Sequence, residues 1–475
     1  MILNNPRKKR KERIHMLEKI SLILVILTIS TLVLAQGVIA FAPANANFVA
    51  TFKNNGQNYS ALKKVPIFSF LLDDLGIESL IKSSVSQTAL SINVRTSQIW
   101  DALQNNFVIF GKGKATMNPE ITKTSVAIVL KSNSNIVTKL LYALVGGTVG
   151  TKKIDNTTFK TFTTSGVTIY ILNHGSYVLL SNSPELILSA INSYDGKVPS
   201  FKTFGNVPSN AWFSLYFQGG FSETSTSDVI PKDAFVYGKI DGNSLSITGV
   251  TAFEYRDKTL ESKILSFKPN VKTLESVPAT GDFWAAADVA DPVGIYKIVK
   301  KYVKGLEKGK VAEEEALDLV KHTNGKLFMN MNVSSNKEEY VASIYLSKSL
   351  SKYIPSISKG ASATFMWKGH TVLRDDTIEG TKTISDYTIF YPDKVVFSNM
   401  PPENASKYLE AHSMAKDMGN FSSFSNQTWN NAFLLGYINV GKIIESALQY
   451  TISSGAILQA KINNKADLVW QLILR

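Results

Sequence analysis

A stretch of about fifty residues occurs twice in this chain, once over 168–217 and again over 388–437. The two copies lie about 220 residues apart, and their motifs follow each other in the same order. Repetition at so long a period indicates a duplicated domain rather than a solenoid of short repeats. The paired motifs are Thr168-Ile169-Tyr170 with Thr388-Ile389-Phe390, Ser181-Asn182 with Ser398-Asn399, Pro184-Glu185 with Pro402-Glu403, and Asn210-Ala211-Trp212 with Asn431-Ala432-Phe433.

Weaker matches extend the duplication toward the N-terminus. We therefore expect two similar domains, 43–270 and 271–475, and we interpret the polar stretch 258–276 as the connection between them. The matches are Pro43-Ala44 with Pro278-Ala279, Phe48-Val49-Ala50 with Phe283-Trp284-Ala285, and Val126-Ala127-Ile128 with Val341-Ala342-Ser343-Ile344.

Turn and cap residues indicate the fold class of each domain. The residues Asn173-His174-Gly175-Ser176 separate two apolar runs, which is typical of a β-hairpin. Ser183 then predicts a helix cap, and Pro184 suits the first helical position. Helices that interrupt hairpin-connected strands predict an α+β domain with a largely antiparallel sheet.

Three helices are expected in the first domain before the repeated stretch. They are a helix over 60–81, a short helix capped by Ser97, and a helix over 135–144 that ends at Gly146.

Two strands of the repeats carry apolar side chains on both faces. They span 211–217 and 432–438, and neither alternates apolar and polar residues as a half-exposed strand does. We therefore expect each strand to be central in its sheet and covered on both sides. Aspartate at Leu215 or Leu435 is then expected to destabilise the protein, because an unpaired buried charge is costly.

The N-terminus has the pattern of a membrane anchor. A basic segment, 1–19, precedes an apolar run, 20–42, that contains no charged residue. As a helix this run is about 34 Å long, which exceeds a bilayer core of about 30 Å. Because basic flanks stay in the cytoplasm, we expect a single span with residues 43–475 outside the cytoplasm.

A cleaved signal peptide is the alternative interpretation of the same segment. Ala44-Asn45-Ala46 resembles a signal-peptidase site. However, the apolar run is longer than a usual signal core of about 7–15 residues, and Pro43 already belongs to the first repeat. The sequence therefore favours an uncleaved signal-anchor.

Composition excludes several classes of site and of partner. The chain has no cysteine, which excludes disulfides and thiolate chemistry. Its net charge is +13, but no dense basic patch with interleaved aromatic residues follows the N-terminal segment, so nucleic acid is not an expected partner. The expected partners are the membrane and an envelope protein, lipid or cell-wall component.

No motif in the chain identifies a reaction. The histidines are isolated, and no zinc-protease, phosphate-binding or nucleophile-elbow motif occurs. We therefore expect no catalytic, cofactor-binding or metal-binding residue, no cofactor and no enzymatic activity. The weak candidates are His15, His174, His322, His370, His412, the pairs Asp73-Asp74 and Asp375-Asp376, and the S-x-x-K patterns Ser349 to Lys352 and Ser356 to Lys359.

The chain resembles an uncharacterised family of bacterial envelope proteins, domain of unknown function 3352. The resemblance rests on the basic and apolar N-terminus and on two later motifs, residues 42–50 and 179–186. It implies an anchored extracytoplasmic protein and supplies no catalytic residues. We expect a binding or structural role in the envelope; the alternatives are a carrier of lipid or peptide in a groove between the repeats, and a hydrolase whose site is not visible in the sequence.

Overall fold

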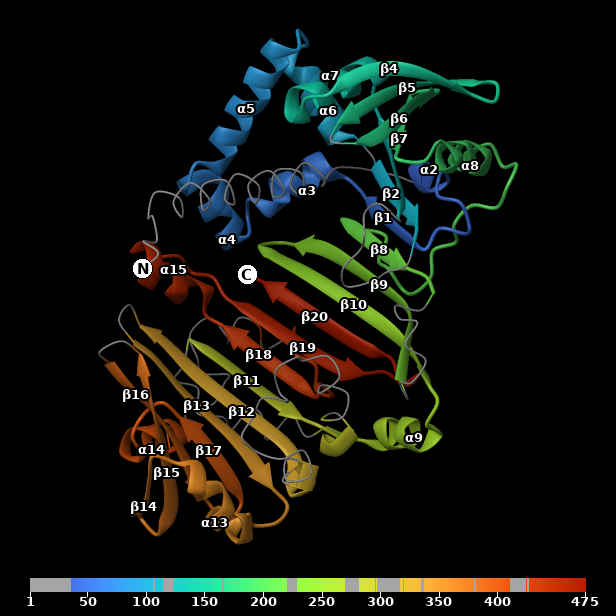
Figure 1. Cartoon of the computed structure of the whole chain (residues 1–475). Helices are drawn as coiled ribbons and strands as arrows, with labels where there is room; N and C mark the ends of the chain where they lie inside the picture. The colour runs from blue at the N-terminus through green and yellow to red at the C-terminus, as the bar shows by residue number, and fades with distance from the viewer. Residues whose placement is uncertain are drawn as a thin grey trace, which may run out of the picture. The chain divides into compact units, whose positions relative to one another are not determined.

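The computed structural model of the chain comprises two compact units, each of which is mostly antiparallel sheet with some helices (Figure 1). Unit 1 is Met1–Thr226 with Ile230–Gly249, and unit 2 is Ser227–Val229 with Val250–Arg475. The structure describes residues 36–105, 107–113, 124–164, 166–219, 229–269, 282–294, 296, 317–318, 320–334, 337–379, 382–410, 424 and 427–475.

The sheet of unit 1 has the ladder order β4-β5-β6-β7-β3-β2-β1-β8-β9, with every neighbouring pair antiparallel. β1 is therefore a central strand, and β8 lies between β1 and β9. The strands are β1 Phe48–Phe52, β2 Phe107–Lys112, β3 Ser125–Lys131, β4 Thr148–Ile154, β5 Thr157–Thr164, β6 Val167–His174, β7 Tyr177–Ser181, β8 Phe213–Phe217 and β9 Val229–Asp241; β10, Ser244–Tyr255, follows β9 in the chain.

The sheet of unit 2 has the ladder order β14-β15-β16-β17-β13-β12-β11-β18-β19-β20, again antiparallel throughout. From β14 to β19 this order repeats that of unit 1 strand for strand. The strands are β11 Phe283–Asp288, β12 Thr323–Ser334, β13 Lys337–Leu346, β14 Ala363–Trp367, β15 His370–Glu379, β16 Lys382–Phe390, β17 Lys394–Ser398, β18 Leu434–Ile438, β19 Ala456–Ile462 and β20 Leu468–Leu474.

The register of the central strands also repeats. Phe48 lies opposite Phe217 in unit 1, and Phe283 lies opposite Ile438 in unit 2. Both pairs occupy the same ends of their strands, so the motif matches at Phe48 and Phe283 agree with the ladders.

The expected match of Thr168 with Thr388 is wrong by three residues. The repeated serines that end β7 and β17 lie opposite Tyr170 and Tyr387, so these two tyrosines correspond. The first hairpin turns over Gly175 and Ser176, between the paired residues His174 and Tyr177. The second turns over Pro392 and Asp393, because Tyr391 N donates to Lys394 O at 2.9 Å. This common turn length sets the register where the short Thr-Ile-aromatic motif does not.

The expected match of Val126 with Val341 is wrong by one residue. The same serines lie opposite Ala127 and Val341, so Ala127 is the true counterpart of Val341. Because side chains of a strand alternate between faces, this one-residue shift decides which residues reach the core.

The repeated Ser-Asn motif fastens β7 to β3 in unit 1. Ser181 Oγ donates to Val126 O at 2.7 Å and accepts from Ser183 N at 3.0 Å. Asn182 Oδ1 accepts from Val126 N at 2.9 Å. The motif therefore continues the ladder with side-chain bonds and leads directly into the capped helix that follows.

The same bonds recur in unit 2. Ser398 Oγ donates to Tyr340 O at 2.9 Å and accepts from Met400 N at 2.9 Å. Asn399 Oδ1 accepts from Tyr340 N at 2.9 Å. The motif thus has a structural role in both units.

Helices connect the strands in both units. As expected, Ser183 caps α8 by accepting from Leu186 N at 3.2 Å, and α7 ends at Gly146. In unit 1, α8 lies beside β6 and β7 (Figure 1). The helices are α2 Gln36–Ile39, α3 Asn55–Leu62, α4 Pro66–Ser69, η1 Phe70–Asp74, α5 Ile77–Ser91, α6 Thr96–Gln104, α7 Ser134–Val145, α8 Pro184–Tyr194, α9 Lys258–Ser266, η4 Ser351–Tyr353, α13 Ile354–Ile357, η5 Ser358–Gly360, α14 Pro402–Glu410 and α15 Val440–Leu448.

Three helix expectations are wrong in detail. The expected helix over 60–81 is broken, since Gly76 adopts φ 68° between η1 and α5. The cap of α6 is Arg95 rather than Ser97, and Gln98 Oε1 accepts from Arg95 N at 3.0 Å. The stretch expected as a polar connection contains α9, which Asp257 caps through two backbone N–H groups.

The expectation that β8 and β18 are central is confirmed, but the expected burial of both faces is wrong for β8. Ser214 and Tyr216 are buried on one face, whereas Phe213, Leu215 and Phe217 are only half-buried on the other. On this half-buried face β1 contributes Phe48, Ala50 and Phe52 as the cross-strand neighbours of Phe217, Leu215 and Phe213.

Leu215 and Leu435, expected as equivalent probes, lie on different faces. The ladders align Leu215 with Gly436, while Leu435 belongs to a buried cluster with Trp284 and Tyr437. The three exposed apolar residues Leu327, Met329 and Leu458 belong to the opposite, half-exposed face of unit 2.

Residues at the end of the predicted membrane span belong to the core of unit 1. Phe41 has no exposed surface and lies among His174, Tyr177 and Tyr194. Val38 and Ala42 are buried as well. The segment 1–19 and residues 20–35 of the expected span lie outside the described residues.

Hydrogen bonds to its backbone hold this N-terminal segment in place. Ser193 Oγ donates to Ala40 O at 2.7 Å, and Phe201 N donates to Ala42 O at 2.7 Å. Ala44 N donates to Pro199 O at 3.0 Å. Asn47 N donates to Gly111 O at 2.8 Å, so the segment on both sides of Ala44-Asn45-Ala46, the site of the alternative signal-peptide interpretation, is part of the folded unit.

Candidate functional site

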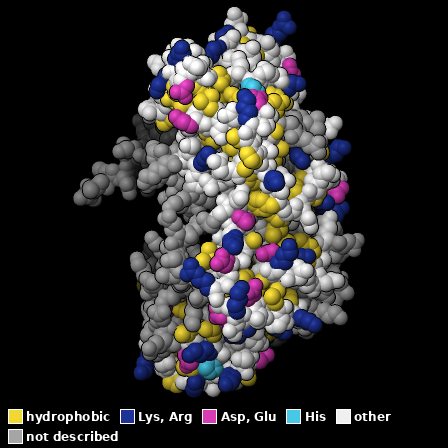
Figure 2. All heavy atoms as spheres, turned by 90° about the vertical axis from the view of Figure 1, so that its right-hand side faces the viewer, with side chains coloured by type: hydrophobic (Ala, Val, Ile, Leu, Met, Phe, Trp, Pro, Cys, Tyr) yellow, Lys and Arg dark blue, Asp and Glu magenta, His cyan; other side chains and the backbone are white. Residues whose placement is uncertain are grey.

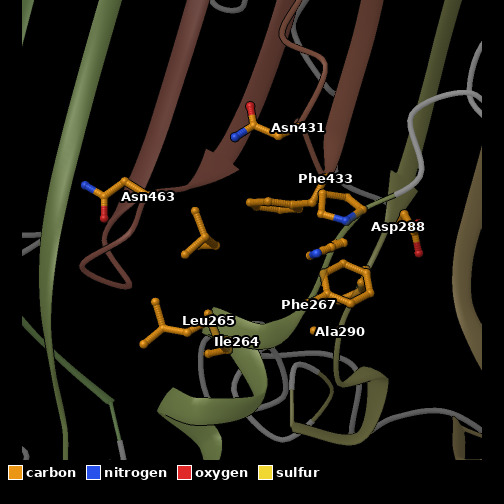
Figure 3. Close-up of a pocket in the computed structure, with 12 residues that line it drawn as sticks. Ile264, Leu265, Phe267, Asp288, Ala290, Asn431, Phe433 and Asn463 are labelled. Atoms are coloured by element: carbon orange, nitrogen blue, oxygen red, sulfur yellow. The ribbon is translucent and has the colours of Figure 1, made fainter.

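Unit 2 contains a cavity of about 430 Å³ at one end of its central strands (Figure 3). This volume is within the range of small-molecule sites, about 300–1,000 Å³. Most of the lining is apolar, and four polar side chains join it. The lining residues are Ile264, Leu265, Phe267, Lys268, Pro269, Asp288, Val289, Ala290, Asn431, Phe433, Ile462 and Asn463.

One wall of the cavity follows from the end of β11. Asp288 N donates to Phe433 O at 2.7 Å, which fixes the aromatic residue beside the strand. Val289 N then donates to Gly325 O at 3.0 Å. Gly325 has φ 86°, and a Cβ atom there would lie 2.2 Å from Val289 O. Only glycine permits this close approach of β12 to the wall.

The opposite wall comes from α9 and the residues after it. Ile264, Leu265 and Phe267 face the cavity from this side (Figure 3). Lys263 of α9 lies 3.6 Å from Asp291 in an ion pair, and Asp291 Oδ1 accepts from Gly294 N at 2.9 Å. These contacts connect α9 to the chain that follows β11, so both walls are joined at one end.

The polar groups of the cavity differ in their availability. Asn463 is occupied, because its Oδ1 accepts from Lys465 N and Asp467 N and its Nδ2 donates to Asp467 Oδ2. In the described part of the chain, Lys268 and Asn431 make no hydrogen bond or ion pair, and both are exposed. The cavity therefore presents one free ammonium group and one free amide beside an apolar lining.

Asp288 is the remaining polar group of the lining. Its exposed fraction is only 4% and it is not free of interactions. In Figure 3 its carboxylate lies at the margin, away from Ile264 and Leu265. We therefore treat Asp288 as part of the wall rather than as a group available to a ligand.

The equivalent position in unit 1 is occupied by two side chains. The ladders align Phe433 with Trp212, and Trp212 Nε1 donates to Asn55 Oδ1 at 2.8 Å. Both residues are buried. Ala290 stands where unit 1 has Asn55, because each lies seven residues after the first residue of its strand, Phe283 in β11 and Phe48 in β1. The bonded indole and amide of unit 1 thus become a phenyl ring and a methyl group in unit 2.

The histidines do not form a site. His174 Nε2 lies 3.0 Å from Asp195 Oδ1, beside Phe41. His322 Nδ1 bonds to Asp318 O, and His370 contacts the ring of Tyr391. His15 and His412 lie outside the described residues. Each described histidine therefore has a separate local contact in the fold.

The paired carboxylates also separate. Asp73 Oδ1 forms an ion pair with Lys63 at 2.8 Å, and the Asp74 side chain is exposed. Asp376 bonds to Arg374 at 3.0 Å and to Ser385. No group of three His, Cys, Asp or Glu residues suited to a metal occurs within the residues that the structure describes.

The serine–lysine patterns have structural contacts. Ser349 Oγ accepts from Ser351 N, and Ser356 Oγ donates to Tyr353 O. The Lys352 ammonium lies over the Tyr353 ring, 4.4 Å from its centroid. These serines stabilise turns, and the lysine packs on an aromatic ring instead of activating a hydroxyl.

The pKa of one carboxylate, that of Glu78, is strongly lowered by its lysine neighbours. Glu78 bonds to Lys63 at 2.7 Å and to Lys82 at 2.9 Å. The hydrogen bond from Lys63 is the main cause that lowers the pKa of Glu78 to about 2. This network joins the end of α3 to α5 and η1 within unit 1.

Charges on the visible surface are mixed. On the face in Figure 2, Lys and Arg side chains are interspersed with Asp and Glu rather than gathered in one patch. Hydrophobic side chains appear between them.

Sequence reasoning did not identify the cavity residues as a site. They come from four distant stretches, and none belongs to a recognised motif. The repeat alignment did contain one signal: Trp212 of the first copy is replaced by Phe433 in the second.

Comparison of the chain with family models, with curated proteins and with solved structures finds no match. The resemblance to the envelope family therefore stays an expectation. Among the described residues, no helix combines the length and the apolar character needed to cross a membrane.

Proposed function

We propose that this chain is a non-catalytic binding protein of the cell envelope, held at the membrane by its N-terminal segment with the remainder outside the cytoplasm. It binds an apolar ligand, and the site is the cavity of unit 2. Its partners are the membrane and a lipid, cell-wall or protein component of the envelope, without nucleic acid and without a cofactor.

The observation that carries the binding role is the apolar cavity. A largely apolar lining with a few polar groups at its margin is typical of sites for small molecules. Lys268 and Asn431, which make no hydrogen bond or ion pair with the residues that the structure describes, can orient a ligand there. The described histidines and the serines Ser349 and Ser356 each have a structural contact of their own, which fits the proposed binding role.

The packing of the N-terminal segment supports the membrane attachment. The last residues of the uncharged run 20–42 are buried in unit 1 from Val38 to Ala42, so residues 20–37 are left for the bilayer, about 27 Å of helix. Burial of Phe41 and Ala42 supports an uncleaved anchor, since cleavage after Ala46 would remove both residues from the folded unit.

The common strand order supports an origin by internal duplication, with domains 43–270 and 271–475. The nine-strand ladder β4 to β9 is matched by β14 to β19, and the Ser-Asn motif makes the same bonds in both. Duplication allows one copy to keep a closed core while the other acquires a ligand site.

The test is the mass spectrometry of ligands that co-purify with the full-length protein. We expect an apolar molecule with the wild type and its loss in Ala290→Trp, whose indole takes up space at the lining position Ala290. Ile378→Trp is the matched control, since Ile378 is 76% exposed on β15. Equal ligand content in all three proteins contradicts the proposal.

The two alternative functions, a structural protein and a hydrolase, predict different results in ligand analysis and in an activity screen. A purely structural envelope protein carries no ligand in either the wild type or the variants. A hydrolase turns over a substrate in an activity screen and loses turnover when one polar residue is replaced.

A further inference from the structure

The free polar groups of the unit 2 cavity indicate the chemical class of its ligand. We infer that the cavity takes an anionic amphiphile, whose apolar chain occupies the lining and whose carboxylate or phosphate contacts Lys268. This inference rests on the proposed binding function and adds the charge of the ligand head group to it.

Lys268 is the first basis for this inference. It is the second residue after α9, lies between Phe267 and Pro269, and contributes to the cavity lining. It makes no ion pair with any described carboxylate. By contrast, Lys263 of α9 is paired with Asp291. An ammonium group without an ion-pair partner beside an apolar cavity favours an anionic ligand, since a charge-assisted hydrogen bond is roughly twice as strong as one between neutral groups.

Asn431 provides a second group that can orient the head group. It is exposed, carries no described hydrogen bond, and lies across the cavity from Ile264 and Leu265 (Figure 3). Its amide N–H groups donate to the oxygens of either a carboxylate or a phosphate. The one carboxylate of the lining, Asp288, is buried and already engaged, and it lies at the margin.

The comparison with unit 1 explains why an apolar chain enters here. In unit 1 the Trp212 indole and the Asn55 amide are bonded to each other and buried. In unit 2 the corresponding Phe433 and Ala290 supply neither the indole donor nor the amide acceptor. At these two positions the wall of the cavity therefore offers only apolar contact.

The experiment uses the full-length protein in nanodiscs of phosphatidylcholine, which is zwitterionic. Three diazirine probes with the same apolar chain are compared: a fatty acid, the corresponding fatty alcohol and a lysophosphatidylglycerol. Labelled peptides are mapped by mass spectrometry. We expect acid labelling of the peptides that contain residues 258–269 and 283–294 to exceed alcohol labelling by about tenfold, the effect of one charge-assisted bond.

Lys268→Gln tests whether the site prefers an anionic head group, independently of whether the site binds an apolar chain. We expect this variant to reduce the acid-to-alcohol ratio to near one while alcohol labelling is unchanged. Lys359→Gln, at an exposed lysine of η5, is the matched control and keeps the wild-type ratio. A ratio near one in the wild type, or a ratio unaffected by Lys268→Gln, overturns the inference and leaves the proposed binding function standing.

Ala290→Trp tests the site itself. We expect it to abolish labelling by all three probes at these peptides. Undiminished labelling overturns both the proposed function and this inference. Labelling of the wild type by both the acid and the lysophospholipid means that the site accepts a carboxylate and a phosphate. Labelling by only one of them shows which of these two anionic groups the site accepts.

Discussion

The ring of Phe41 stacks on the ring of Tyr194, with their centroids 4.0 Å apart and their planes inclined by 11°. This contact joins the end of the predicted membrane span to the last residue of α8. Cleavage after Ala46 would remove Phe41 from its site and leave a cavity between Tyr177 and Tyr194.

We expect the mature protein to retain Phe41. Phe41→Ala should reduce the free energy of unfolding by about 3–5 kcal/mol, as for other buried phenylalanines. Tyr142→Ala, at a 58% exposed tyrosine of α7, is the control and should change stability little. Denaturant unfolding measures both variants, and the intact mass measures the N-terminus. A mature chain that begins at Asn47 contradicts this prediction.

Aspartate substitutions distinguish the two faces of the central strands. Leu435→Asp places a charge in the buried cluster with Trp284 and Tyr437 and should cost several kcal/mol. Leu215→Asp lies on the half-buried face of β8 and should cost clearly less. Equal losses in denaturant unfolding would mean that both faces are equally closed.

The Ser-Asn motif predicts matched effects in the two units. Ser181→Ala and Ser398→Ala each remove a bond to a strand carbonyl and a bond from a backbone N–H. Each should reduce the free energy of unfolding by about 1–3 kcal/mol. Ser262→Ala, which removes an exposed bond on α9, is the control. A large effect in only one unit would show that the motif is not equivalent in the two.

The ion pairs of Glu78 predict an acid-dependent loss of stability. Its pKa is about 2 in the folded protein, below the ordinary 4.5, mainly because Lys63 donates a hydrogen bond to it. The folded state therefore favours the ionised form, so this stabilisation is present above pH 4.5 and is lost as the pH falls toward 2.

Glu78→Gln should remove about 1–2 kcal/mol of the stability difference between pH 6 and pH 3. Glu261→Gln, in an exposed pair with Lys258 on α9, should leave that difference unchanged. Chemical denaturation at the two pH values measures it. An unchanged difference in Glu78→Gln would exclude this network as the cause.

The parts of the fold that the sequence predicted correctly depend on local chemistry. The hairpin β6–β7 and the cap at Ser183 follow from turn and capping residues. The register between the copies failed at Thr168 because a three-residue motif can shift along an alternating strand, and only the ladder fixes its position.

The candidate site was beyond prediction for a different reason. Its walls come from α9, from the ends of β11 and β18, and from the turn after β19, and α9 was itself expected to be a connection. Apolar residues such as Ile264 and Phe433 do not differ in type from core residues. Only their placement around an empty volume distinguishes them.

The position of β1 between β2 and β8 affects the order in which unit 1 can form. Thr51 and Ser214 share a hydrogen bond although they are 163 residues apart in the chain. Ribosomal synthesis delivers β8 long after β1, and pairing of such distant segments is slow. For a chain proposed to leave the cytoplasm, this delay keeps unit 1 unfolded and able to pass through a translocation channel until its last central strand has been made.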